Sequence, residues 1–187
     1  MAAVVTPTVV GQSLTLDPDF GWVLVAAVLM AFQLWTEGIP VGRMRGKLFT
    51  RAFFKQHFPN LDPNKVPENG YPDMGSGLYA SKLPHDDWVR FNNAQRVHYN
   101  YLEGIALVLV VELVAGLFFA RYAALLGFVY IVGRLIYGLG YRSSGSRGRV
   151  LGVLLVDLTL LALLSLALYG SFTFAGGLPG FFRLLGL

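Results

Sequence analysis

Two groups of ionisable and aromatic side chains stand out in this sequence because each lies at the end of a long apolar stretch. The first group is Arg96, Asn100 and Glu103, which come just before an apolar run. At about 100° of rotation per residue, a helix would bring these three side chains onto one face, within about 60° of one another. Such a face could hold a polar ligand or pair with a second polar face.

The second group lies along one stripe of another predicted helix. At the same rotation per residue, a single face would carry Tyr130, Arg134, Tyr137 and Tyr141. At about 1.5 Å of rise per residue, Glu103 and Arg134 would reach similar depths, with Asp157 of a further helix near that level. Leaving one such charge buried and unpaired costs several kcal/mol, so we expect a cluster of Glu103, Arg134 and Asp157.

These polar residues have two interpretations, a binding site and a packing network. Ionisable residues inside membrane helices usually line a site, which favours binding; a network that fixes helix packing and register is the alternative. His98 points away from the stripe that holds Asn100, and a lone histidine is more often a hydrogen-bonded interface residue than a ligand. Glu112 lies about 180° around the helix from Glu103 and much deeper, so we expect a subunit contact or a protonated, hydrogen-bonded carboxyl there.

The composition indicates that helices in a lipid bilayer position these groups. Of the 187 residues, 55% are hydrophobic and 14% are charged, and the mean hydropathy is +0.55. A membrane-spanning helix needs about 20 mostly apolar residues, and we predict spans at about 20–36, 92–120, 122–142 and 149–172. The predicted fold is therefore an all-α, multi-pass integral membrane four-helix bundle that forms a single domain over residues 1–187.

Basic residues are concentrated in two of the three connections between these spans. The first connection, a loop of about residues 37–90, carries Arg43, Arg45, Lys47, Arg51, Lys55, Lys65, Lys82 and Arg90. The third connection carries Arg142, Arg147 and Arg149, whereas the second has only Arg121. The positive-inside rule therefore places the first and third connections in the cytosol. The long first loop is expected to lie against lipid headgroups or a neighbouring subunit, with disorder as the alternative.

Several classes of chemistry are not supported by the sequence. It contains no cysteine, so any thiol chemistry must use sulfur from another molecule. Its three histidines, His57, His85 and His98, lack the close spacing of metal ligands on a helix, so we expect no metal site. No nucleic-acid motif is present, and the basic flanks are expected to face anionic lipid headgroups rather than DNA or RNA.

Three stretches together resemble the MAPEG family, the membrane-associated proteins in eicosanoid and glutathione metabolism, and especially its third-type microsomal glutathione transferases. They run from Val41 to Arg45, from Phe91 to Glu103 and from Gly127 to Tyr141. The Arg-x-His-x-Asn-x-x-Glu pattern that ends at Glu103 is fairly specific, and the order of the three stretches strengthens the match. The resemblance implies a homotrimer of four-helix subunits that holds glutathione between neighbouring subunits near the cytosolic surface.

The resemblance also implies which residues hold glutathione. The candidates are Arg45, Arg96, His98, Asn100, Glu103, Arg134, Tyr137 and Tyr141. Arginine suits the two carboxylates of glutathione, and Glu103 suits its amino group. In the family, an arginine near the start of the fourth helix contacts the sulfur, and both Arg147 and Arg149 fall in that region as catalytic candidates. A cation beside the sulfur lowers the thiol pKa and so favours the reactive thiolate.

The activity that the resemblance implies is glutathione-dependent. It is a transferase or peroxidase reaction on lipophilic electrophiles or lipid hydroperoxides that enter from the bilayer, with glutathione as cosubstrate. The endoplasmic reticulum is the expected location, and a mitochondrial membrane is the alternative. A non-enzymatic lipid-binding protein, or an accessory subunit of a larger membrane complex, is the alternative function. A transporter is a third hypothesis, since Glu112, Arg134 and Asp157 are charges within predicted spans.

Overall fold

A computed structural model describes residues 16–187, and every regular element in this range is helical. The long helices are α1 (Phe20–Leu48), α3 (His85–Gly148) and α4 (Val150–Phe174). The short ones are α2 (Arg51–His57), α5 (Gly177–Leu184) and the 3-10 turns η1 (Pro63–Lys65), η2 (Glu68–Gly70) and η3 (Ala80–Lys82). The prediction of an all-α fold is confirmed for this range. Residues 1–15 of the predicted domain lie outside the described residues.

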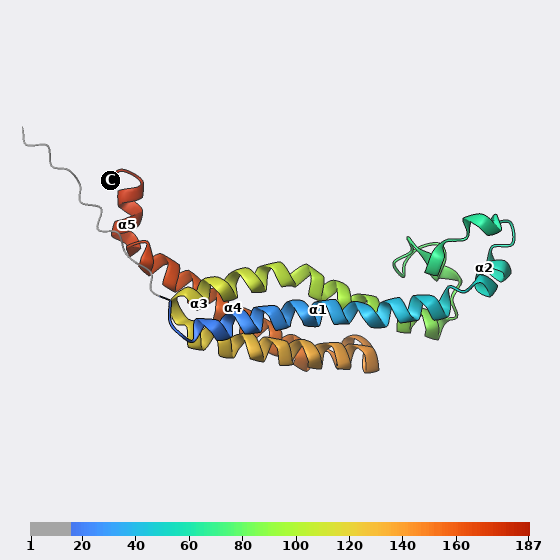
Figure 1. Cartoon of the computed structure of the whole chain (residues 1–187), viewed down its shortest axis with the longest axis horizontal. Helices are drawn as coiled ribbons and strands as arrows, with labels where there is room; N and C mark the ends of the chain where they lie inside the picture. The colour runs from blue at the N-terminus through green and yellow to red at the C-terminus, as the bar shows by residue number, and fades with distance from the viewer. Residues whose placement is uncertain (1–15) are drawn as a thin grey trace, which may run out of the picture.

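Helix α3 folds back on itself at Phe119 (Figure 1). The backbone angles there, φ −139° and ψ 53°, are far from helical. We call residues 85–118 the first arm and residues 120–148 the second arm. The arms run antiparallel, because Val97 near the start of the first packs against Gly138 near the end of the second, with Val97 Cγ1 3.3 Å from where a Cβ on Gly138 would be. The predicted boundary between the spans at about 92–120 and 122–142 lies close to this break.

Helices α1, α3 and α4 are each long and apolar enough to cross a membrane. Their outward faces carry large exposed apolar side chains, among them Trp35, Leu107, Val110 and Leu161. Their inward faces form a common core that includes Val23, Met30, Val108 and Leu163. Soluble proteins rarely leave so much contiguous apolar surface in water. The chain is therefore an integral membrane protein.

Helix α4 and the second arm approach each other closely where they cross. A Cβ on Gly152 of α4 would lie 2.3 Å from the backbone nitrogen of Tyr137 and 2.4 Å from its Cα. Only glycine fits there, because the obstacle is backbone and cannot rotate away. The beginning of α4 therefore packs against the part of the second arm that carries Tyr137 and Tyr141 of the predicted glutathione site.

The first connection differs from its prediction. Helix α1 continues beyond residue 36, through Pro40, to Leu48, so the expectation of a loop over all of residues 37–90 is corrected. The apolar stretch marks how much of α1 lies in lipid, not where its backbone stops being helical. The remaining connection contains α2 and three 3-10 turns, and α3 already begins at His85.

Residues 49–84, which we call the cap, fold beyond one end of the long helices (Figure 1). Their apolar core also draws on α1 and α3, and its buried members are Val41, Phe49, Phe54, Ala80, Phe91 and Ala94. Phe49 packs edge-on against Phe91 with 5.4 Å between ring centroids, and Phe54 packs against Tyr79 at 5.1 Å. Burial of these rings orders the cap, so the alternative of a disordered loop is wrong for these residues. Its contact with headgroups or a neighbouring subunit stays a prediction.

Candidate functional site

Arg134 lies between the two arms of α3 and is only 3% exposed. Its Nη1 donates to Asn100 Oδ1 at 2.8 Å, and its Nη2 donates to the Val97 carbonyl at 3.5 Å. The guanidinium also lies over the rings of Tyr101 and Tyr137, 4.2 Å and 4.7 Å from their centroids. These contacts offset part of the cost of burying a charge among apolar helices. Of the predicted site residues, the structure brings Arg134, Asn100 and Tyr137 together.

The predicted cluster of Glu103, Arg134 and Asp157 does not form. Both carboxylates are on exposed residues, and in the part of the chain that the structure describes no ion pair joins either of them to Arg134. The error lies in the register between the arms, since Asn100 rather than Glu103 is level with Arg134. Three residues further along the first arm, Glu103 is also rotated by about 60° toward the outside.

The outer face of the first arm carries Arg96 and Glu103, both exposed, with Asn100 half-buried beside them. His98 is also half-buried but points toward α1. Its Nε2 lies 3.6 Å from where a Cβ on Gly38 would be, so this glycine leaves room for the imidazole. The structure therefore places His98 at a helix interface, apart from the face that Arg96, Asn100 and Glu103 share.

Tyr137 connects the surroundings of Arg134 to the start of α4. Its ring centroid lies 5.7 Å from that of Tyr141, and its hydroxyl accepts a long hydrogen bond of 3.5 Å from Arg149 Nη1. The Arg149 guanidinium also lies 5.3 Å from the centroid of the Tyr141 ring. Arg147 is exposed, and no such contact involves it in residues 16–187. Of the two candidate arginines, the structure thus brings Arg149 to the tyrosines.

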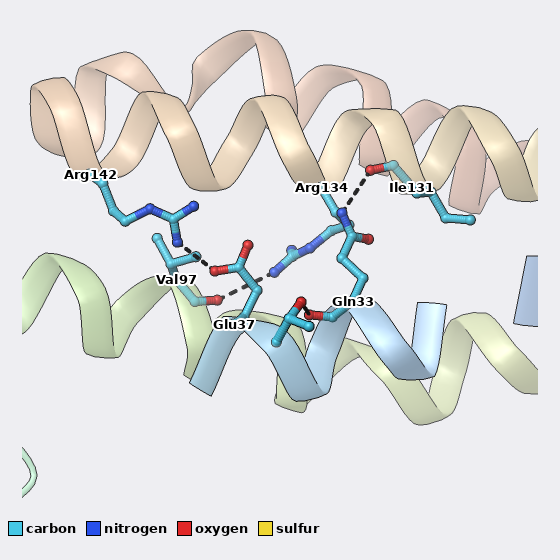
Figure 2. A network of polar contacts seen from close by, with 7 residues as sticks. Gln33, Glu37, Val97, Ile131, Arg134 and Arg142 are labelled. Carbon is cyan, nitrogen blue, oxygen red and sulfur yellow. Dashed lines mark hydrogen bonds and ion pairs between the residues drawn. The ribbon is translucent and has the colours of Figure 1, made fainter. Parts of the chain in front are cut away.

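Polar contacts that the sequence analysis did not foresee tie α1 to the second arm of α3 (Figure 2). Glu37 Oε2 accepts from Arg142 Nη1 at 2.5 Å, and Gln33 Nε2 donates to the Ile131 carbonyl at 3.1 Å. Gln33 Oε1 accepts from the Tyr101 hydroxyl at 2.9 Å. The sequence did contain an indication of these contacts. Gln33 and Glu37 are one helical turn apart, which places two polar groups on one face of an apolar helix.

Arg45 holds the cap onto α1. It is 1% exposed, and its guanidinium donates to the carbonyl oxygens of Asn69, at 3.2 Å, and of Asp73. The ring of Tyr71 covers the same guanidinium, with its centroid 4.0 Å from Cζ. These contacts use the hydrogen-bonding and stacking capacity of the side chain within the cap. The structure therefore does not bring Arg45 to the other predicted glutathione-binding residues.

Asp73 fixes the cap turn that Arg45 contacts. Its Oδ1 accepts from the backbone N–H groups of Gly75, at 2.8 Å, and Gly77, at 3.0 Å, and its Oδ2 accepts from that of Ala80 at 2.8 Å. Burial by itself would raise the pKa of this carboxyl, but the N–H donors together outweigh burial and hold the pKa below its usual value. The ionised carboxylate is therefore part of the folded cap.

The depressed pKa of Asp73 predicts that the cap loosens in acid. The ionised Asp73 carboxylate stabilises the folded cap. This stabilisation is fully present above the unfolded-state pKa of about 3.9 and is lost as the pH falls through the lower, folded-state pKa. At near-neutral pH, Asp73→Asn should lower amide protection factors in residues 73–80 by about ten-fold, because bonds to a charged acceptor are lost. Hydrogen exchange measured by mass spectrometry checks this. Asp62→Asn, which alters an exposed carboxylate with a single backbone donor, should leave protection in residues 73–80 unchanged.

Glu112 is fully buried inside the subunit, at 0% exposure. It faces α1 and the second arm, since a Cβ on Gly127 would lie 2.1 Å from Glu112 Oε1 and 2.9 Å from Ala26 Cβ. The predicted subunit contact is therefore wrong. Neither carboxyl oxygen has a hydrogen-bond partner among residues 16–187, so the partner expected for a protonated form is not found there either. Glu112 lies apart from the face of Arg96 and Glu103.

A family model matches the chain over residues 21–169, from the first turn of α1 to near the end of α4, and its description is MAPEG family. The chain belongs to the MAPEG family. The MAPEG match includes the cap and both arms of α3, and hence every residue of the predicted glutathione site. Helix α5 lies beyond it.

Proposed function

We propose that this MAPEG protein is a glutathione-dependent membrane transferase or peroxidase, close to the third-type microsomal transferases, that acts on lipophilic electrophiles or lipid hydroperoxides. The family includes such enzymes as well as non-enzymes. The observation that carries the proposal is the uncovered polar face of Arg96, Asn100 and Glu103. Just beyond it, Val110 is 60% exposed on the same arm and faces lipid. Charged side chains are costly next to lipid, so this face needs a partner.

A neighbouring subunit and glutathione together supply that partner. We expect a homotrimer in which α1, α4 and each arm of α3 cross the membrane, giving four crossings per subunit. Arg96 pairs with a carboxylate of glutathione, and Glu103 accepts from its amino group. Asn100 is oriented by the bond that its Oδ1 accepts from Arg134, which leaves its amide N–H groups for the ligand.

Arg149 is the cation that we assign to the glutathione sulfur. It approaches the tyrosine pair from the start of α4, whereas Arg147 does not. The thiolate that Arg149 stabilises attacks an electrophilic carbon, and a C–S bond forms as the leaving group departs. With a lipid hydroperoxide, the thiolate attacks the terminal peroxide oxygen, so that an S–O bond forms as the O–O bond breaks. The products are glutathione sulfenic acid and an alkoxide, which takes a proton from water to become the alcohol. A second glutathione then converts the sulfenic acid to glutathione disulfide and water. We place this chemistry in the endoplasmic reticulum membrane.

The proposal is tested on the full chain reconstituted in lipid nanodiscs. Isothermal titration measures glutathione binding, conjugation of 1-chloro-2,4-dinitrobenzene measures transferase activity, and reduction of cumene hydroperoxide measures peroxidase activity. Binding together with either activity supports the enzyme. Binding without turnover supports a non-enzymatic lipid-binding protein or an accessory subunit instead. No binding at millimolar glutathione contradicts the site itself.

Substitution of the two candidate arginines should separate their roles. Arg149→Ala removes the cation beside the sulfur, so the pKa of bound glutathione rises; one unit corresponds to about 1.4 kcal/mol and about ten-fold less thiolate below that pKa. Arg147→Ala, the matched control, removes an exposed charge three residues from the start of α4 and should leave the thiolate unchanged. Ultraviolet absorbance of the thiolate, titrated against pH, gives both values. Equal losses in the two variants would contradict the assignment.

A further inference from the structure

The cap contains two adjoining hollows that no residue of the proposed glutathione site lines. The first, of about 520 Å³, has mainly apolar walls, which include Phe54, Phe58, Leu61 and Val66. The second, of about 640 Å³, has mainly polar walls, which include Thr50, Asn64, Glu68 and Asn69. They meet at four residues that line both, Arg51, Pro63, Asn64 and Val66. An apolar hollow therefore adjoins a polar one.

Positive charge is concentrated at the junction and along the apolar hollow. Arg51 lines both hollows and Lys55 lines the apolar one; they are one turn apart on α2 and so lie on the same face. Neither forms an ion pair with a residue in the described range. The only acidic side chain in the lining is Glu68, in the polar hollow. An anion beside Arg51 and Lys55 would meet two cations and no carboxylate in the apolar hollow.

We propose that these hollows bind a single-chain lipid with an anionic head, with the chain in the apolar hollow and the head at Arg51 and Lys55. Both volumes fall within the range of about 300–1,000 Å³ for small-molecule sites. A compact phosphate would use the cations but leave the apolar walls in water, and an uncharged lipid would leave both cations without a partner. Phe54 is 1% exposed within the cap core, so this wall of the hollow is preformed.

The length of α1 places the cap, and with it these hollows, at the surface of the membrane. α1 has 29 residues, which at about 1.5 Å per residue exceeds the roughly 30 Å hydrocarbon core of a bilayer. The cap lies beyond the Leu48 end of α1 (Figure 1). Because α1 is longer than the hydrocarbon core, the cap is within reach of lipids at the membrane surface and of free fatty acids in solution. The two sources carry the same chemistry, an acyl chain and one anionic head. This proposal does not rest on the catalytic one.

Photo-crosslinking tests the site on the full chain in nanodiscs of zwitterionic phospholipid. One arm uses a fatty acid with a diazirine in its chain, and the other uses a lysophosphatidic acid with the same group. Peptide mapping by mass spectrometry should place crosslinks within residues 51–69, and unlabelled ligand should compete them away. Labelling by one probe only identifies its head as the one recognised, and labelling by both indicates that any single anionic head suffices.

Two variants and a control decide the outcome. The double change Arg51→Ala and Lys55→Ala should reduce labelling of residues 51–69 by about ten-fold, as expected for the loss of charge-assisted contacts. Leu61→Trp, which fills the apolar hollow but keeps both cations, should reduce it as well. Lys82→Ala removes an exposed cap cation outside both hollows and should not. Crosslinks confined to the lipid-facing helices, or equal labelling of the double variant and the Lys82→Ala control, would overturn the proposal.

Discussion

Replacing Gly152 with alanine will destabilise the protein by about 3 kcal/mol, the upper end of the usual overpacking cost. The added Cβ would lie 2.3 Å from the Tyr137 nitrogen, well inside van der Waals contact. Backbone cannot rotate out of the way as a side chain can, so α4 must move as a unit. Its first residues would then carry Arg149 away from the Tyr137 hydroxyl. Thiolate formation on bound glutathione should therefore fall together with stability.

Gly42→Ala is the matched control for this effect. Apart from the neighbouring residues and backbone of α1 itself, no atom lies within 4 Å of the position where a Cβ on Gly42 would be. Alanine is also favoured over glycine in a helix by about 1 kcal/mol, so this variant should be neutral or slightly more stable. Thermal unfolding of both variants, followed by circular dichroism, measures the difference. Similar midpoints would show that α4 accommodates the methyl group and that the contact at Tyr137 does not control the position of α4.

The helices themselves were predictable because lipid imposes a length and a composition on them. The predicted first span and α1 both start at residue 20, and the turn between the second and third spans matches the break at Phe119. The extension of α1 to Leu48 was not predictable from hydropathy, because a helix that leaves the bilayer continues with polar residues. The folded cap was missed since its Pro, Asn and Gly residues indicate turns but say little about the aromatic core that buries them.

The site was predicted in part. Helical rotation correctly placed Asn100 and Arg134 on facing stripes, because that angle depends only on each helix taken alone. The relative depth of two residues on different arms depends on how the arms are staggered, and the rise per residue does not give this stagger. The predicted pairing of Glu103 with Arg134 failed for that reason. Arg45 shows a second limit. An arginine suits a carboxylate ligand, yet the guanidinium of Arg45 donates to carbonyl groups of the cap that lie more than twenty residues away in the sequence.

Arg134→Met should separate the glutathione site from a packing network. Two cation–π contacts contribute up to about 2 kcal/mol each when desolvated, and a charge-assisted hydrogen bond contributes about 1.5–3 kcal/mol. Burying the guanidinium costs several kcal/mol, so the favourable contacts and the cost of burial nearly cancel. Methionine is flexible and apolar, and it fills much of the space between the rings of Tyr101 and Tyr137. The thermal midpoint should therefore stay the same or rise.

Glutathione binding should respond differently in the same variant. Without Arg134, Asn100 Oδ1 loses its donor and Tyr137 loses the cation that lies over its ring, so neither is held for the ligand. We expect the dissociation constant for glutathione to rise by about ten-fold or more, measured by calorimetry in nanodiscs. Arg134→Lys keeps a donor for Asn100 but lacks the planar group over the rings, and should recover part of the affinity. A lowered midpoint with unchanged affinity would mean that Arg134 only holds the two arms together.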